Sequence, residues 1–161
     1  MSVDVGTVAP DFTLVNQDRE PVTLSSFRGT PVVLAFFPGA FSGTCTAELC
    51  TVRDRLARLN GAGGQVLGIS VDTFFALKAF RDAHSLSFPL LCDFNKEVIR
   101  LYGVFNEDMI GLKGLAKRAV FVLDPAGVVR YAEILEDARD EPDYDAVFRT
   151  LDAVQDSPAA S

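Results

Sequence analysis

The chain has 161 residues, of which 48% are hydrophobic, and it carries a formal net charge of −7 at neutral pH. The hydrophobic content excludes a disordered chain, and the acidic balance argues against nucleic acid or an anionic membrane surface as a partner. We expect one domain over residues 1–155 and a flexible tail over residues 156–161.

Strand-like and helix-like segments alternate along the first part of the chain. Short strands are predicted over 12–17 and 21–24, on either side of a polar turn, and residues 25–30 are predicted to form a loop. The continuous apolar segment 31–37 is typical of a strand that is covered on both faces. A helix is predicted over 44–60, because apolar residues recur there at helical spacing, at Cys45, Leu49, Val52, Leu56 and Leu59.

The alternation continues toward the end of the chain. Further strands are predicted over 65–71, 88–94, 119–123 and 128–134, and further helices over 73–84, 95–103 and 143–155. Asp72 or Thr73 suits the cap of the 73–84 helix, and Gly103 closes the short 95–103 helix. The turn sequence DPAG joins the last two strands into a hairpin. Strands that alternate with helices and end in a hairpin predict an α/β fold with three layers around a mixed sheet.

The opening sequence and the cysteine count bear on the location of the protein. The segment MSVDVGTVAPDF lacks the basic start, the apolar core and the cleavage site of a secretory signal, and no window approaches about 18 uninterrupted apolar residues. We therefore expect a cytoplasmic protein with no membrane span. Three cysteines in a reducing compartment argue against a disulfide scaffold and favour redox, catalytic or core roles.

Two of the three cysteines lie five residues apart at the start of the predicted 44–60 helix. We expect Thr44 to cap this helix and Cys45 to lie in its first turn, where free amides and the helix dipole stabilise a thiolate. A reactive sulfur and an ordinary core cysteine are both consistent with Cys45 taken alone. Cys50 lies about 140° around the helix from Cys45 and off the apolar stripe, so packing explains it poorly.

A disulfide between these two cysteines requires a change in the helix. Their Cα atoms are about 8.6 Å apart in an intact helix, beyond the limit of roughly 7 Å for a disulfide, so the helix must first unwind locally. The residues before Cys45 suit a short polar substrate. Pro38 adds no donor, the Ser42 hydroxyl can donate and accept, and the amides of residues 43–45 point into the same space.

The residues Pro38, Ser42 and Cys45 form the pattern P-x-x-x-S-x-x-C. This pattern resembles the P-x-x-x-[T/S]-x-x-C active-site loop of the peroxiredoxins, thiol peroxidases with a thioredoxin-like fold. The resemblance extends over VGTVAPDFTL, VVLAFFP, FPLLCDF, YGVFNE and RAVFVLDPAGVVRY. The spacing of Cys45 and Cys50 resembles the peroxiredoxin Q, or bacterioferritin comigratory protein, branch. The stretch around YGVFNE is more similar to the one-cysteine alkyl hydroperoxidase E branch.

The resemblance implies an enzyme that reduces hydrogen peroxide and small organic hydroperoxides. The Cys45 thiolate would attack the terminal oxygen of the peroxide and become a sulfenic acid. Cys50 would then form an intramolecular disulfide with Cys45, and thioredoxin or a similar dithiol would reduce that disulfide.

The resemblance also assigns the other residues of the site. The amides of Ser42 and Cys45 would hold the peroxide, and Pro38 would shield the sulfur. Arg118 would stabilise the thiolate and polarise the peroxide bond. Glu48, on the same helix face as Cys45, would hold Arg118. The family more commonly has threonine at the position of Ser42. Serine keeps the hydroxyl and lacks one methyl contact.

The remaining cysteine and the one histidine leave other questions open. Cys92 replaces the serine that these branches usually carry, so it is either a second resolving thiol or a partly buried bystander. His84 is expected near the end of its helix and away from the 38–45 motif, as a surface or capping residue, which argues against a Cys-His hydrolase. No spacing of cysteine and histidine suggests zinc, and no cofactor is implied.

Two alternative functions use the same cysteines. A thiol-disulfide carrier fits the fold but is weakened by the absence of a C-x-x-C motif. A redox-sensing interaction protein would use oxidation of Cys45 to unwind the 44–60 helix and change a partner surface. Fast, repeated turnover of peroxide would separate a peroxidase from such a sensor. A monomer and a homodimer are both compatible with the sequence.

Overall fold

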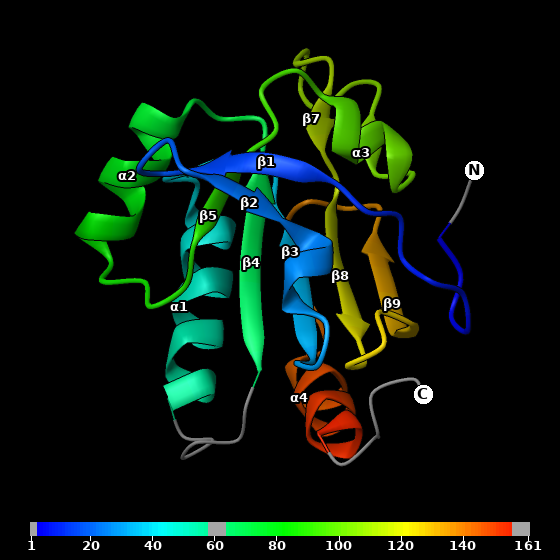
Figure 1. Ribbon diagram of the computed structural model, residues 1–161. Helices are drawn as coiled ribbons and strands as arrows, with labels where there is room; N and C mark the ends of the chain where they lie inside the picture. Colours follow the sequence, from blue (N-terminus) through cyan, green and yellow to red (C-terminus); the bar gives the residue numbers. More distant parts are fainter. Residues whose placement is uncertain (1–2, 58–63, 156–161) are drawn as a thin grey trace.

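A mixed seven-stranded sheet forms the centre of the computed structural model, which describes residues 3–57 and 64–155 (Figure 1). The strand order is β2-β1-β5-β4-β3-β8-β9. The strands of this sheet are β1 (Thr13–Asn16), β2 (Pro21–Thr23), β3 (Val32–Phe36), β4 (Gln65–Ser70), β5 (Leu90–Cys92), β8 (Arg118–Leu123) and β9 (Val129–Leu135). The helices are the 3-10 helix η1 (Leu24–Phe27), α1 (Gly43–Ala57), α2 (Phe74–Ala83), α3 (Glu97–Leu101) and α4 (Tyr144–Val154).

Strand β3 occupies the middle of the sheet. It pairs in parallel with β4 and antiparallel with β8, and β4 pairs in parallel with β5. Every residue of β3 is buried, as expected for an apolar strand that is covered on both faces. Its side chains alternate between two cores, with Leu34 and Phe36 on one face of the sheet and Val33 and Ala35 on the other.

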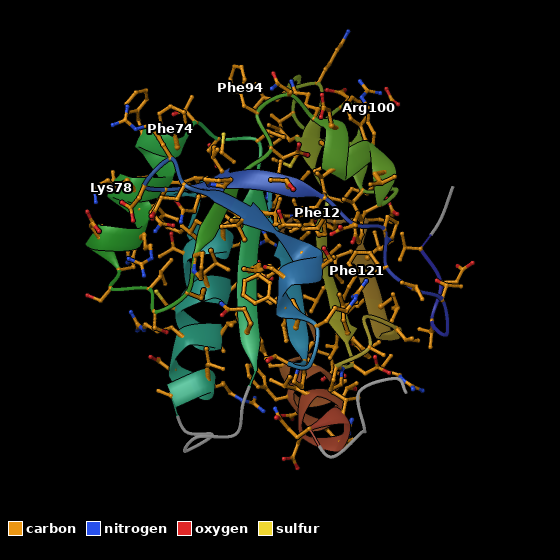
Figure 2. All side chains as sticks on the ribbon, in the orientation of Figure 1. Phe12, Phe74, Lys78, Phe94, Arg100 and Phe121 are labelled. Carbon is orange, nitrogen blue, oxygen red and sulfur yellow. The ribbon has the colours of Figure 1, made fainter. Side chains whose placement is uncertain are left out.

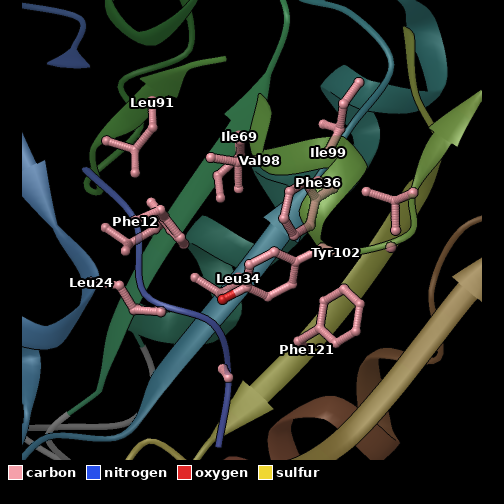
Figure 3. Packing of buried hydrophobic residues seen from close by; sticks show 14 of the residues in the cluster. Phe12, Leu24, Leu34, Phe36, Ile69, Leu91, Val98, Ile99, Tyr102 and Phe121 are labelled. Carbon is pink, nitrogen blue, oxygen red and sulfur yellow. The ribbon is translucent and has the colours of Figure 1, made fainter. Parts of the chain in front are cut away.

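Helices cover both faces of the sheet. Residues of α1, α2 and α4 complete the core on the Val33 face. Residues of α3, η1 and the segment before β1 complete the core on the Phe36 face. Figure 3 shows this second core, in which the Tyr102 ring centroid lies 5.4 Å from that of Phe36 and 5.5 Å from that of Phe121. The predicted three-layer α/β architecture with a mixed sheet is confirmed.

The structure differs locally from the predictions in two places. The predicted loop over 25–30 begins as part of η1, because the buried Leu24 anchors a short helical turn there and ends the preceding strand at Thr23. A hairpin of β6 (Phe105–Asn106) and β7 (Leu115–Ala116) has no counterpart among the predicted elements. Strands of two residues are too short to show an alternating pattern.

The helix ends are fixed by local hydrogen bonds. The Ala76 amide donates to the Thr73 hydroxyl at 3.3 Å, so Thr73 rather than Asp72 caps α2. Gly103 follows α3 with a left-handed φ of 71°, and the Val104 amide donates to the Ile99 carbonyl at 2.8 Å, which confirms the predicted glycine stop.

Some predictions are not tested by this structure. The predicted end of the 44–60 helix, with Leu59, and the tail over 156–161 lie outside the described residues. The assignment of residues 1–155 to one domain stays a prediction. Among the described helices, none combines the length and the apolar character that crossing a membrane requires.

Candidate active site

The site begins in the loop between β3 and α1. Pro38 lies two residues after the end of β3 and is buried. The Ala40 amide donates a hydrogen bond to the Asp72 carboxylate at 2.8 Å, and the Ser70 hydroxyl donates to the same carboxylate oxygen at 2.7 Å. Asp72 therefore holds the loop from the carboxyl end of β4. The sequence offers one signal for this role, an acidic residue directly after a buried strand.

Ser42 starts helix α1. The Cys45 amide donates to Ser42 Oγ at 3.3 Å, and the Thr46 amide donates to the Ser42 carbonyl at 2.9 Å. These bonds make Ser42 the N-cap, so the prediction of Thr44 is wrong. Both side chains suit a cap, and only the path of the backbone distinguishes them. The cap also affects the site, because it engages the Cys45 amide in a hydrogen bond to the Ser42 hydroxyl.

Three buried polar groups meet where α1 faces the start of β8. Nη1 of Arg118 donates to Cys45 Sγ at 3.3 Å and to Glu48 Oε1 at 2.7 Å. The exposed fraction is 0% for Cys45 and Glu48 and 1% for Arg118, so all three side chains are shielded from bulk water. Cys45 and Glu48 share the inner face of α1 because they are three residues apart. The structure thus brings together three residues that the sequence analysis named.

Arg118 is the positive charge beside the sulfur. Burial alone would lower the pKa of Arg118, but the charges of Glu48 and Cys45 outweigh it and raise the pKa above its ordinary value. Burial raises the pKa of Glu48 to about 7, against the opposing attraction of Arg118. Nη2 of Arg118 also donates to the Ala138 carbonyl at 2.8 Å. That contact could not be found from the sequence, because a backbone oxygen leaves no residue signature.

A cleft of about 420 Å³ leads to this group of residues. Pro38, Ser42 and Arg118 line this cleft together with residues 43–44, 109–110 and 137–139. The hairpin between β6 and β7 carries residues 109–110 to the cleft. The site therefore places a cation and a helix N-terminus beside one cysteine, and the cleft connects that cation with solvent. A cation and a helix N-terminus are surroundings in which a cysteine thiolate is stabilised and reactive.

Comparison with known protein families decides the identity of this site. The family model described as the AhpC/TSA family matches residues 5–132. The chain belongs to this family. It is a peroxiredoxin, a thiol peroxidase with a thioredoxin-like fold, as the motif at residues 38–45 predicts.

Relatives of this peroxiredoxin come from both branches that the sequence resembles. Alkyl hydroperoxide reductase E of Mycobacterium tuberculosis is 42% identical over 135 residues, which are 82% of this chain and 86% of the relative. Chloroplastic peroxiredoxin Q of Triticum aestivum is 42% identical over 129 residues, 80% of this chain and 58% of the relative. The crystal structure of peroxidoxin BcpB from Mycobacterium tuberculosis matches with a TM-score of 0.83 at 30% identity, covering 94% of this chain and 98% of that one.

Cys50 of the peroxiredoxin lies on α1 and is half-buried, with a free thiol. Helix α1 is continuous from Gly43 to Ala57, and the Cys45 thiol is also free. The structure is thus the reduced form with the helix intact. Its two sulfurs belong to different faces of the same helix, as their spacing predicts.

Cys92 of the peroxiredoxin ends β5 and is half-buried. It lines a second cleft, of about 280 Å³, together with Phe74 and Phe94. Figure 2 shows these two aromatic side chains at the outer edge of the molecule. The second cleft shares no lining residue with the first. The choice between a resolving thiol and a bystander for Cys92 stays open.

His84 lies closer to the active-site loop than the sequence suggests. It is the C-cap of α2, as predicted, but its ring centroid lies 6.3 Å from that of Phe41 and 5.3 Å from that of Phe80. Phe41 belongs to the 38–45 loop, has a left-handed φ of 67° and is 54% exposed. The prediction that His84 lies away from the motif is therefore wrong. Its contact with the loop is aromatic and runs through Phe41.

Proposed function

We propose that this peroxiredoxin reduces hydrogen peroxide and small organic hydroperoxides at Cys45, that Cys50 resolves the product, and that thioredoxin or a similar dithiol recycles the enzyme. The hydrogen bond from Arg118 to the Cys45 sulfur carries the proposal. It places a cation on a cysteine at a helix N-terminus, beside a cleft that a peroxide can enter.

The first step is attack of the Cys45 thiolate on the terminal oxygen of the hydroperoxide. A sulfur–oxygen bond forms as the oxygen–oxygen bond breaks, which leaves a sulfenic acid on Cys45 and an alkoxide or hydroxide that takes up a proton. Arg118 stabilises the charge that moves onto the departing oxygen, and Glu48 fixes Arg118 in place. The Cys45 amide, now bonded to Ser42, transfers its hydrogen bond to the peroxide, and Pro38 covers the sulfur.

The dimensions of the cleft support organic as well as inorganic peroxides. Its volume of about 420 Å³ is many times the roughly 30 Å³ that one water molecule occupies in the liquid, so it exceeds what hydrogen peroxide needs. Ile110 at the cleft is 96% exposed and stands next to Met109. These side chains offer apolar contacts to an alkyl substituent while the hydroperoxide group reaches Arg118.

The second step is resolution by Cys50. The Cys50 thiolate attacks the Cys45 sulfenic sulfur, a disulfide forms, and the sulfenic oxygen leaves as hydroxide and is protonated to water. The intact α1 keeps the two Cα atoms too far apart, so its first turns must open before this step. The left-handed φ of 67° at Phe41, next to the Ser42 cap, is a source of backbone strain that favours this opening.

Replacing the resolving thiol tests the proposal. Cys50→Ser is expected to react with its first equivalent of peroxide at a rate within about threefold of wild type, because Arg118, Glu48 and Cys45 are unchanged. It is expected to accumulate a sulfenic acid and to lose recycling by thioredoxin, which is measured by trapping the sulfenic acid and by steady-state turnover.

Cys92→Ser is the matched control for that experiment and is expected to turn over like wild type. Unchanged turnover of Cys50→Ser would remove Cys50 from the cycle. Loss of recycling in Cys92→Ser alone would assign resolution to Cys92.

The cytoplasmic location is also part of the proposal. An odd count of three cysteines, without the pairs of a disulfide scaffold, suits a compartment that keeps thiols reduced. A monomer and a homodimer are both compatible with the chemistry, because every residue invoked in the cycle comes from one chain.

A further inference from the structure

One guanidinium nitrogen serves two groups that can each carry a negative charge. Nη1 of Arg118 lies 3.3 Å from Cys45 Sγ and 2.7 Å from Glu48 Oε1. Arg118 is the one cationic partner of Glu48 among the ion pairs of the described residues. Within the same part of the chain, the second carboxyl oxygen of Glu48 has no hydrogen-bond partner, and neither has Nε of Arg118.

The surroundings of Glu48 add negative charge. From β9, Glu133 accepts a hydrogen bond from Tyr131 at 2.8 Å, and from the segment before α4, Glu141 accepts one from Tyr144 at 2.5 Å. Both carboxylates raise the pKa of Glu48, after the larger effect of burial. The pKa of Tyr144 is raised by burial and by its hydrogen bond to Glu141, and the charge of Glu48 adds a smaller contribution. Arg118 is the group that opposes these effects and lowers the pKa of Glu48.

A count of charges limits the protonation states of this site. If Cys45 and Glu48 were both ionised, the group would hold two anions and one cation, and the excess negative charge would lie on side chains that are fully buried. Burying an uncompensated charge is costly, and a buried group responds by taking up a proton. If one of the two anions is protonated, the remaining anion and Arg118 form a neutral pair. Two strongly interacting groups of this kind titrate as a unit.

We propose that Cys45 and Glu48 share a single proton in the reduced enzyme, so that the thiolate forms by transfer of the thiol proton to the Glu48 carboxyl. This inference rests on the proposed role of Cys45 and assigns Glu48 a task beyond holding Arg118. Cys45 thiol and Glu48 carboxylate become Cys45 thiolate and Glu48 carboxylic acid, with no change in the charge of the buried group.

The shared proton also balances the reaction with peroxide. The sulfenic acid on Cys45 is neutral, so Arg118 then has one anion to pair with, and Glu48 ionises. Glu48 gives up one proton, and the departing alkoxide or hydroxide takes up one proton, so the proton count balances. In the balanced step, the Cys45 thiolate becomes a sulfenic acid and the Glu48 carboxylic acid becomes a carboxylate. The hydroperoxide becomes an alcohol or water, and the total charge is unchanged.

Infrared difference spectroscopy tests the sharing directly. The reduced wild type at neutral pH is expected to show the carbonyl band of a buried carboxylic acid that Glu48→Gln lacks. Cys45→Ser is expected to lose the same band, because serine does not ionise and Glu48 becomes the only anion on Arg118. A band that persists unchanged in Cys45→Ser, or that is absent from the wild type, would overturn the inference.

The thiolate absorbance of Cys45 gives a second, independent readout. Each protein is titrated against its own Cys45→Ser counterpart, which removes the signals of Cys50 and Cys92. Glu48→Gln is expected to move the Cys45 titration to lower pH by about one unit, because a competing anion is removed. A residue that only orients Arg118 would give the opposite shift when replaced. Glu133→Gln, which changes a neighbouring carboxylate outside the shared pair, is expected to shift the titration by much less.

Neither readout uses peroxide, so the inference and the proposed function can fail separately. Peroxide consumption without the infrared and titration effects would support the proposed peroxidase function and reject the shared proton. The infrared and titration effects without peroxide consumption would support the shared proton and reject the peroxidase function.

Discussion

Cys45→Ser is expected to lower the rate of peroxide reduction by at least about 10⁴-fold, to the level of the reaction without enzyme. Cys45 is the one cysteine that combines full burial with a hydrogen bond from Arg118, so no other thiol of the described residues has its surroundings. A serine hydroxyl in the same position stays neutral and cannot form a sulfenic acid. Peroxide consumption and sulfenic acid formation, measured on the same sample, check this result.

The Cys45→Ser protein is expected to keep its fold, because serine is close to cysteine in size and the rest of the Val33-face core is unchanged. Circular dichroism and thermal unfolding therefore serve as the control for a misfolded variant. A folded Cys45→Ser protein with wild-type turnover would show that another group attacks the peroxide.

Arg118→Met is expected to lower the rate constant for the reaction with peroxide by about 10²–10³-fold, the loss typical when one stabilising donor is removed from a transition state. The variant removes the donor on the Cys45 sulfur and the cation that faces the developing charge. It also leaves Glu48 buried without its cation, so the unfolding free energy is expected to fall by about 3–5 kcal/mol. Stopped-flow kinetics and denaturant unfolding measure the two effects.

Arg130→Met is the matched control. Arg130 is a half-exposed arginine of β9 that pairs with Asp124 at 2.8 Å and has no contact with the active-site cleft among those found. Its replacement is expected to leave the peroxide rate within about threefold of wild type. Equal losses in Arg118→Met and Arg130→Met would mean that general destabilisation, and not the contact with Cys45, explains the effect of Arg118.

Local patterns predicted most of the fold because each pattern reports one element. The apolar segment 31–37 predicted β3, and the spacing of Cys45, Leu49 and Val52 predicted α1 and its buried face. The cap of α1 was placed two residues late, because Ser42 and Thr44 are both good caps and the choice depends on where the backbone enters the helix. The short β6–β7 hairpin left no pattern to find.

The contacts across the site depend on tertiary structure. Arg118 and Cys45 are 73 residues apart, and one arginine among 15 lysines and arginines has no local feature that selects it. Its assignment came from the resemblance of the surrounding motifs. The roles of Asp72 and of the Ala138 carbonyl had no such support, because one depends on the packing of β4 beside the loop and the other on a backbone oxygen.

The most direct test of peroxide reduction at Cys45 is a mass measurement and peptide map after one equivalent of hydrogen peroxide is added to the reduced wild-type protein. We expect a product lighter by two hydrogens, in which a disulfide joins Cys45 to Cys50 and Cys92 stays reduced. An unmodified Cys45, with the peroxide unconsumed, would contradict the proposal that this sulfur is the group that attacks peroxide.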